Sequence, residues 1–224
     1  MTEKQLAKIK EKEEKARLRL EKEIERTKAM MVYENKFKEY GIVCGIDEAG
    51  RGPLAGPVVA GACILPDHLI LYLNDSKKLS AKKRDELYEV IVNEAASWGV
   101  GMASPGRIDE IGILNATYEA MREAVSKLNP SPDVTLNDAV KIPQLNIKQV
   151  PIVHGDGLSC SIAAASILAK VTRDRLMIEY DEIFPEDGFA KHKGYGTAEH
   201  KKALQQYGPT IIHRKQFVET FLSR

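Results

Sequence analysis

The sequence has 224 residues and a mass of 24.9 kDa, enough for one compact domain with a substantial core plus an appendage. With 43% hydrophobic and 29% charged residues, the composition indicates an ordinary soluble protein and excludes a disordered, fibrous or membrane class. The 33 Lys and Arg residues nearly balance the 32 Asp and Glu residues, so a nucleic-acid partner has to be argued from local features.

Charge is nevertheless segregated along the chain. Residues 1–40 contain 12 Lys and Arg against 9 Asp and Glu, which leaves 21 against 23 for the remainder. Three widely spaced cysteines, Cys44, Cys63 and Cys160, indicate reduced thiols rather than a disulfide framework. No apolar stretch approaches the roughly 20 residues of a membrane span, and the N-terminus has no signal-peptide pattern, so we expect a cytoplasmic protein.

Residues 3–38 contain no Gly or Pro and are rich in strong helix formers, which predicts one long helix. Opposite charges recur at helical neighbours such as Glu11 and Lys15, as in a solvated helix. The apolar stripe is thin. The pattern therefore favours a charged helix that lies on the domain or projects from it over a coiled-coil or nucleic-acid arm.

After Gly41 the pattern changes to short runs of β-branched residues. IVCGID and PVVAGACIL predict two strands joined by a tight turn, and Ser80 predicts the N-cap of a helix that ends near Ala96. Further strands are expected near residues 98–103, 134–136 and 150–153, and further helices over residues 113–128 and after Ser159, Thr197 and Arg214. This order predicts an α/β domain with a mixed sheet.

Two adjacent acids, Asp47 and Glu48, end the first predicted strand and precede the loop Gly50-Arg51-Gly52. Adjacent strand residues point to opposite faces, so both acids can join one site only if the strand ends or bends there, as the glycines allow. The loop leads into a strand rather than a helix, which excludes a dinucleotide-binding turn. What remains is a loop that can approach a sugar or phosphate closely.

Two more acids follow predicted strands, Asp138 and Asp156. Each alone is more typical of a turn or helix start than of a ligand. Together with the first pair they predict an all-oxygen site of the kind that Mg²⁺ and Mn²⁺ prefer.

Four motifs extend this hypothesis: GIDEAGRGPLAGPVVA from Gly45, NDSKKLS from Asn74, GDGLSCSIAAASILAKVTRD from Gly155 and HKGYGTAEH from His192. Together, over about residues 43–217, the chain resembles bacterial ribonuclease HII. The resemblance implies a ribonuclease H-like fold and an endoribonuclease that cuts the RNA strand of RNA–DNA hybrids. It also implies cleavage 5′ of single ribonucleotides in duplex DNA, leaving 3′-hydroxyl and 5′-phosphate ends by a two-metal-ion mechanism.

The resemblance also implies residue roles. The catalytic and metal-binding acids would be Asp47, Glu48, Asp138 and Asp156, holding two divalent cations, Mg²⁺ or Mn²⁺. Contacts to the substrate, including the ribose 2′-hydroxyl and backbone phosphates, would come from Gly50, Arg51, Gly52, Tyr195, Lys77 and Lys78. The partners would be RNA–DNA hybrids and ribonucleotide-containing DNA duplexes, with no membrane. We expect a monomer in which residues 1–40 form a charged helical extension of a catalytic domain of residues 41–224.

One position departs from the family pattern. The family usually has glycine after its third acid, but this chain has Asp138-Ala139, which leaves Asp133 as the fallback ligand. Ser159 and Ser161 are expected to cap a helix or to touch phosphate. The rival hypotheses are a non-catalytic nucleic-acid-binding module, an adaptor that acts through residues 1–40, and another ribonuclease H-like enzyme, such as a type I ribonuclease H or an integrase.

Overall fold

The computed structural model describes residues 3–223 and contains a mixed five-stranded sheet in the order β3-β2-β1-β4-β5. The strands are β1 (Val43–Ala49), β2 (Val58–Ile64), β3 (Ser97–Ala103), β4 (Val134–Asp138) and β5 (Lys148–Ile152). β1, β2 and β3 pair antiparallel, whereas β4 runs parallel to both β1 and β5. The predicted mixed sheet is confirmed, but the predicted tight turn is wrong: residues 50–57 form an extended loop between β1 and β2.

The helices are α1 (Glu3–Met30), α2 (Val32–Phe37), α3 (Ala81–Glu94), α4 (Pro105–Ile111), α5 (Ile113–Ser126), α6 (Cys160–Ile183), α7 (Phe189–His192), α8 (Ala198–Tyr207) and α9 (Lys215–Leu222). Ser80 caps α3 through its side chain as predicted, and Ser159 caps α6, which confirms one of the two roles expected of it. Thr197 caps α8 in the same way. The short helices α4 and α7 were not predicted. No helix among residues 3–223 has both the length and the apolar character needed to cross a membrane.

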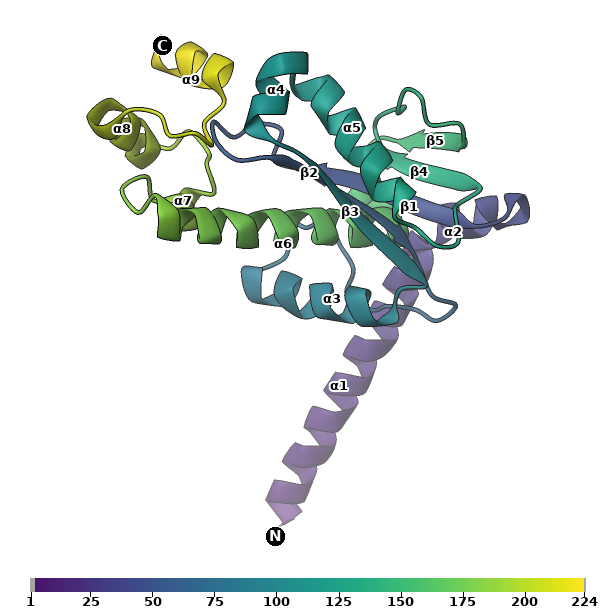
Figure 1. The fold of residues 1–224 in the computed structure, drawn as a ribbon. Coiled ribbons are helices and arrows are strands. Elements are labelled where there is room, and N and C mark those ends of the chain that lie inside the picture. Colours follow the sequence, from purple (N-terminus) through teal and green to yellow (C-terminus); the bar gives the residue numbers. More distant parts are fainter. Residues whose placement is uncertain (1–2, 224) are drawn as a thin grey trace.

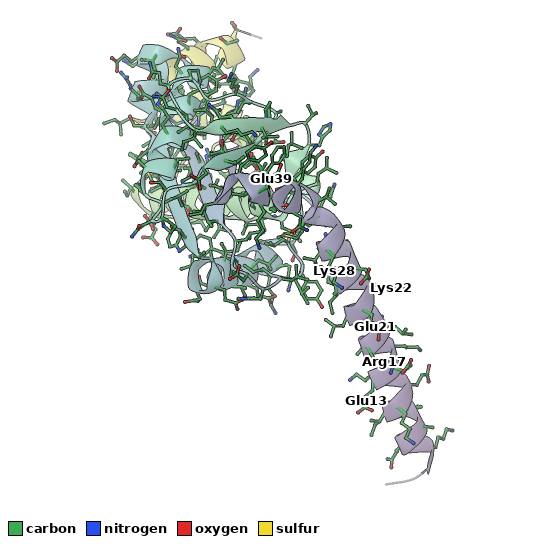
Figure 2. The ribbon with its side chains drawn as sticks, turned by 90° about the vertical axis from the view of Figure 1, so that its right-hand side faces the viewer. Glu13, Arg17, Glu21, Lys22, Lys28 and Glu39 are labelled. Carbon is green, nitrogen blue, oxygen red and sulfur yellow. The ribbon has the colours of Figure 1, made fainter. Side chains whose placement is uncertain are left out.

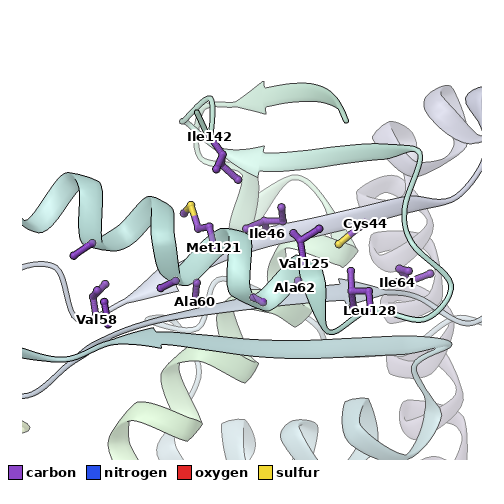
Figure 3. Packing of buried hydrophobic residues seen from close by; sticks show 14 of the residues in the cluster. Cys44, Ile46, Val58, Ala60, Ala62, Ile64, Met121, Val125, Leu128 and Ile142 are labelled. Atoms are coloured by element: carbon purple, nitrogen blue, oxygen red, sulfur yellow. The ribbon is translucent and has the colours of Figure 1, made fainter. Parts of the chain in front are cut away.

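Helices cover both faces of the sheet (Figure 1), with α5 on one face and α6 and α3 on the other. On the α5 face, Ile46 and Ala62 of the sheet pack with Met121 and Val125 (Figure 3). The small helices α7, α8 and α9 gather at one end of the sheet, beside the β1–β2 loop. This end carries the candidate site.

α6 lies against the sheet because both surfaces consist of small residues. A Cβ atom at Gly45 would lie 2.1 Å from the carbonyl carbon of Ser161, and one at Gly61 would lie 2.2 Å from the Ala165 carbonyl oxygen. The predicted packing role of the alanines of α6 is confirmed, since residues 163–165 and Ala169 are fully buried. Close approach of α6 fixes where its N-terminal turn stands relative to β1.

The N-terminal segment is not the single helix that the sequence predicts. Met31 interrupts it, and α2 then turns so that Tyr33 and Phe37 pack beside β4 and β5. Figure 2 shows Glu13, Arg17 and Glu21 on the part of α1 that projects away from the domain. The last turns of α1 differ, because Thr27 and Met30 are buried. Burial of apolar side chains therefore breaks a segment whose local propensity is uniformly helical.

Candidate active site

Four acids gather at one edge of the sheet. Because β1 and β4 are parallel neighbours, their carboxyl ends meet there, which brings Asp47 and Glu48 beside Asp138. Asp156 joins them from the turn before α6, since the amide of Gly155 donates to Asp138 Oδ1 at 2.8 Å. We call Asp47, Glu48, Asp138 and Asp156 the acidic cluster. β1 continues through Ala49, and the backbone bends next, at Gly50 with φ of 92°.

The acidic cluster is electrostatically unfavourable without a cation. Burial raises the pKa of Asp47 well above its usual value, and the charges of Glu48 and Asp138 raise it further. Burial also raises the pKa of Glu48, although Arg51, 3.2 Å away, opposes that effect. Carboxylates that repel one another in a buried place are suited to binding divalent cations through oxygen.

Asp75 is a fifth acid at this site, and the sequence did not single it out. Its side chain shares a hydrogen bond with Asp156, and burial and the charge of Asp75 raise the pKa of Asp156. Although burial opposes it, a hydrogen bond from the Lys77 amide holds the pKa of Asp75 below its usual value.

The two lysines predicted to bind phosphate stand next to these acids. Lys77 Nζ lies 3.6 Å from Asp156 Oδ2, and Lys78 Nζ lies 3.6 Å from Asp75 Oδ2. Both side chains are largely exposed. Although burial opposes it, the charges of Asp156 and Asp47 raise the pKa of Lys77. Lys77 therefore stays protonated and can meet an approaching phosphate.

The Gly50-Arg51-Gly52 loop lies beside Tyr195. A Cβ atom on Gly52 would be 4.0 Å from Tyr195 Cε1, and the amide of Leu54 donates to the carbonyl of Gly194 at 2.8 Å. The Tyr195 side chain is 44% exposed. The predicted substrate-binding residues of the two loops are therefore neighbours, and the tyrosine is accessible to a ligand.

The two candidates for the third acid lie at opposite ends of β4. Asp133 precedes β4 at the opposite end of that strand, where its Oδ2 accepts from the Ile42 amide at 2.8 Å. It is remote from the other acids, so the fallback assignment is wrong. Asp138 lies in the cluster, and Ala139 after it has φ of 55°, in the left-handed region where the family usually places glycine.

The serines at the start of α6 do not face a phosphate site. Ser159 Oγ donates to Glu34 Oε1 at 2.5 Å, and the amide and hydroxyl of Ser161 donate to the same oxygen. All three residues are buried. The alternative that Ser159 and Ser161 touch phosphate is therefore wrong, and the acceptor comes from the N-terminal extension.

A second group of metal-ligand residue types, Asp187, His200 and His213, has ligand atoms within 4.8 Å of one another. The backbone amide of Thr210 donates to His213 Nδ1, which leaves the ring proton on Nε2. That proton faces His200 Nε2 at 2.9 Å, and His200 Nδ1 donates to the Tyr195 carbonyl. This chain of hydrogen bonds needs no metal and fixes the backbone at Tyr195.

Comparison with known proteins adds an independent line of evidence. A family model described as "Ribonuclease HII" matches residues 44–220. A ribonuclease HII from Lachnoclostridium phytofermentans is 58% identical over 206 residues, covering 92% of this chain and 81% of that protein. A solved PCNA:RNase HII complex from Archaeoglobus fulgidus contains a chain with 26% identity and a TM-score of 0.66, covering 79% of this chain and 93% of that one.

A more distant structure, Bst-RNase HIII in complex with Mn²⁺, shares the fold with a TM-score of 0.57 at 14% identity. The match covers 81% of this chain and 69% of that one. These similarities agree with the mixed sheet and its flanking helices.

Proposed function

The chain belongs to the ribonuclease HII family of metal-dependent endonucleases that act on RNA–DNA hybrids, and on that premise we propose that the acidic cluster is its catalytic centre. The observation that carries the proposal is the meeting of Asp47, Glu48 and Asp138 at the ends of two parallel strands, with Asp156 joined to them. The presence of all four acids argues against the rival hypothesis of a non-catalytic nucleic-acid-binding module.

The acidic cluster fits divalent cations, since its donors are all carboxylate oxygens and burial raises the pKa of Asp47 in their absence. We propose that it holds two, Mg²⁺ or Mn²⁺. When bound, such ions supply an activated water and stabilise the charge of the departing oxygen. Lys77, beside Asp156, would meet the phosphate, and Lys78 would contact the neighbouring backbone.

We propose that the β1–β2 loop and the segment around Tyr195 recognise the ribonucleotide. Gly50, Arg51 and Gly52 would contact the ribose 2′-hydroxyl through their backbone, together with the hydroxyl of Tyr195. The 2′-hydroxyl is the group that distinguishes RNA from DNA at a given position. The predicted product is a cut 5′ of a single ribonucleotide embedded in duplex DNA, with 3′-hydroxyl and 5′-phosphate ends.

We also propose that the chain has two parts with different roles. Residues 41–224 would form the catalytic domain and residues 1–40 its helical extension. We also propose that the working unit is a monomer.

The test is a cleavage assay on a DNA duplex that carries one ribonucleotide, with an all-DNA duplex of the same sequence as control. With Mg²⁺ or Mn²⁺, we expect one cut, 5′ of the ribonucleotide, and none in the control. Asp47→Asn should reduce cleavage at least 1000-fold, whereas Asp85→Asn, an exposed acid paired with Arg175, should cleave like the unmodified protein. Full activity of Asp47→Asn, or cleavage of the all-DNA duplex, would refute the proposal.

A further inference from the structure

Two buried arginines bind the β1–β2 loop from the interior of the domain. Arg173 of α6 and Arg214, which precedes α9, are 1% and 0% exposed. Neither guanidinium has a carboxylate within ion-pair distance among residues 3–223. Burial, and then the charge of Arg173, lower the pKa of Arg214 to about 9, so it remains protonated at neutral pH. Two unpaired buried cations are costly, so compensating hydrogen bonds are expected.

The compensation comes from backbone carbonyl groups. Arg214 donates to the carbonyls of Gly50 at 2.6 Å, Arg51 at 3.0 Å and Gly56 at 2.8 and 2.9 Å. Arg173 donates to the carbonyls of Ala55, Pro57 and Lys193, each at 3.0 Å. Most of the acceptors belong to the loop, and Lys193 belongs to the segment that carries Tyr195. The two arginines therefore fix both proposed recognition loops to one another.

The direction of these carbonyls determines the direction of the loop amides. In a trans peptide the carbonyl of one residue and the amide of the next point in opposite directions. Because the carbonyls of Gly50 and Arg51 point inward to Arg214, the amides of Arg51 and Gly52 point away from it. Arg51 and Gly52 are exposed, and among the described residues their amides have no hydrogen-bond acceptor. The loop presents two free donors beside Tyr195.

Gly50 shows how closely the loop fits its support. It has φ of 92°, and a Cβ atom there would lie 2.1 Å from Arg173 Nε. A side chain would displace the guanidinium and the carbonyls it binds. Glycine is thus required at this position by the arginine beneath it as well as by the backbone angle.

We propose that Arg214 and Arg173 are positioning residues, which orient the amides of Arg51 and Gly52 to bind the ribose 2′-hydroxyl oxygen. The inference rests on the proposed function, because it explains how that function selects a ribonucleotide. Neither arginine touches substrate. Their positive charge lies beneath the loop, where it also offsets the negative charge of an approaching phosphate.

The test measures binding without cleavage, in EDTA, by fluorescence anisotropy of two labelled duplexes that differ only in one ribonucleotide. The readout is the dissociation constant for the all-DNA duplex divided by that for the ribonucleotide duplex. This ratio is insensitive to the fraction of folded protein. Arg214→Met should lower that ratio about tenfold, the equivalent of one hydrogen bond of about 1.4 kcal/mol, with affinity for the all-DNA duplex within twofold. Arg214→Lys, which keeps the charge and some donors, should recover part of the ratio.

The matched control is Arg26→Met. Arg26 also donates to a backbone carbonyl, that of Leu73, but far from the loop. The ratio of the two dissociation constants should therefore be the same for Arg26→Met as for the unmodified protein. If the unmodified protein shows no preference for the ribonucleotide, the proposed function fails. If it shows the preference and folded Arg214→Met and Arg214→Lys retain it fully, only the inference fails.

A second measurement covers the case in which Arg214→Met does not fold. Amide hydrogen exchange of the unmodified protein should slow at Arg51 and Gly52 when the ribonucleotide duplex is added, and less when the all-DNA duplex is added. Equal exchange with both duplexes would refute the amide contact of the proposed function, and with it the inference.

Discussion

The carboxylate of Glu34 accepts hydrogen bonds from the backbone amide and the hydroxyl of Ser161, at 2.8 and 2.7 Å. Glu34 belongs to α2, and Ser161 lies in the first turn of α6, where backbone amides lack acceptors within the helix. A negative charge at this end also interacts favourably with the helix dipole. The N-terminal extension therefore holds the start of the helix that directly follows Asp156.

Glu34→Ala should lower the free energy of unfolding by about 2–3 kcal/mol, since it leaves buried donors at Ser159 and Ser161 without an acceptor. Urea denaturation followed by circular dichroism measures this change. Glu39→Ala, an exposed acid in the same extension, should stay within about 0.5 kcal/mol of the unmodified protein. Equal effects of the two substitutions would show that Glu34 does not anchor α6.

Ala139→Gly should stabilise the protein by about 0.5–1 kcal/mol. Ala139 is exposed and has φ of 55°, a left-handed conformation that costs a non-glycine residue about 1–2 kcal/mol, partly offset by the greater freedom of glycine when unfolded. Ala81→Gly is the control, because Ala81 is exposed in the first turn of a right-handed helix and glycine should destabilise there. Destabilisation by both glycines would contradict the assigned strain at Ala139.

Asp47→Asn should raise the thermal stability of the metal-free protein at pH 7.5 while abolishing cleavage. Burial and Glu48 raise the pKa of Asp47 in the folded protein, so its ionisation costs stability as pH rises from about 4 through that raised value. Asparagine removes this cost. Millimolar Mg²⁺ should then stabilise the unmodified protein by about 1–2 kcal/mol and the variant by less. Equal stabilisation of both by Mg²⁺ would argue against Asp47 as a ligand.

The sequence predicted the parts of the site that depend on strand ends. Asp47 and Asp138 lie near the carboxyl ends of apolar strands, as expected, and the parallel pairing of β1 and β4 brings them together. Asp75 was missed because nothing in NDSKKLS indicates that its carboxyl lies against Asp156. Arg173 and Arg214 were missed for the same reason, since their acceptors in the β1–β2 loop lie more than 100 positions away in the chain. Contacts between distant segments leave no periodic pattern in a sequence.

The break of the N-terminal helix has a comparable cause. Local propensity supports helix throughout residues 3–38, but Tyr33 and Phe37 gain more by packing against the sheet than a continuous helix would allow. The charged residues 1–40 likewise divide into two regions that differ in exposure. The projecting turns around Arg17 are exposed, whereas Thr27 and Glu34 are buried in the domain.

The buried histidines His200 and His213, which are hydrogen-bonded to one another and, through His200, to the Tyr195 carbonyl, should make the stability of the fold sensitive to acid. Burial lowers the pKa values of His200 and His213 to about 4, so between pH 6.5 and 4 the unfolded chain binds protons that the folded protein does not. Asp187 acts in the opposite direction, because burial raises its pKa to about 6 and its contribution to stability grows as pH falls.

The two histidines outweigh this one acid, so the cluster should lose about 2 kcal/mol of stability between pH 7.5 and pH 5. Comparison of urea denaturation at the two pH values, for the unmodified protein and His213→Gln, isolates this contribution. The variant should lose less stability on acidification. An identical loss would show that His213 protonates equally in both states.

Tyr195→Phe should weaken recognition of a ribonucleotide without affecting the acidic cluster. Tyr195 is accessible beside Gly52, and its ring lies 6.0 Å from the guanidinium of Arg173. Phenylalanine keeps the ring but loses the hydroxyl, so the preference for a ribonucleotide duplex over all-DNA should fall about fivefold, as for one hydrogen bond to a neutral group.

Tyr195→Ala should reduce the preference further, because the sugar then loses the ring surface as well. Stabilisation by Mg²⁺ should be unchanged in both variants, since among the described residues no hydrogen bond joins Tyr195 to the acidic cluster. Tyr207→Phe, an exposed tyrosine of α8, is the control and should leave the preference intact. If Tyr195→Ala lost Mg²⁺ stabilisation to the same degree as ribonucleotide preference, the tyrosine would be supporting the whole site rather than reading the 2′-hydroxyl.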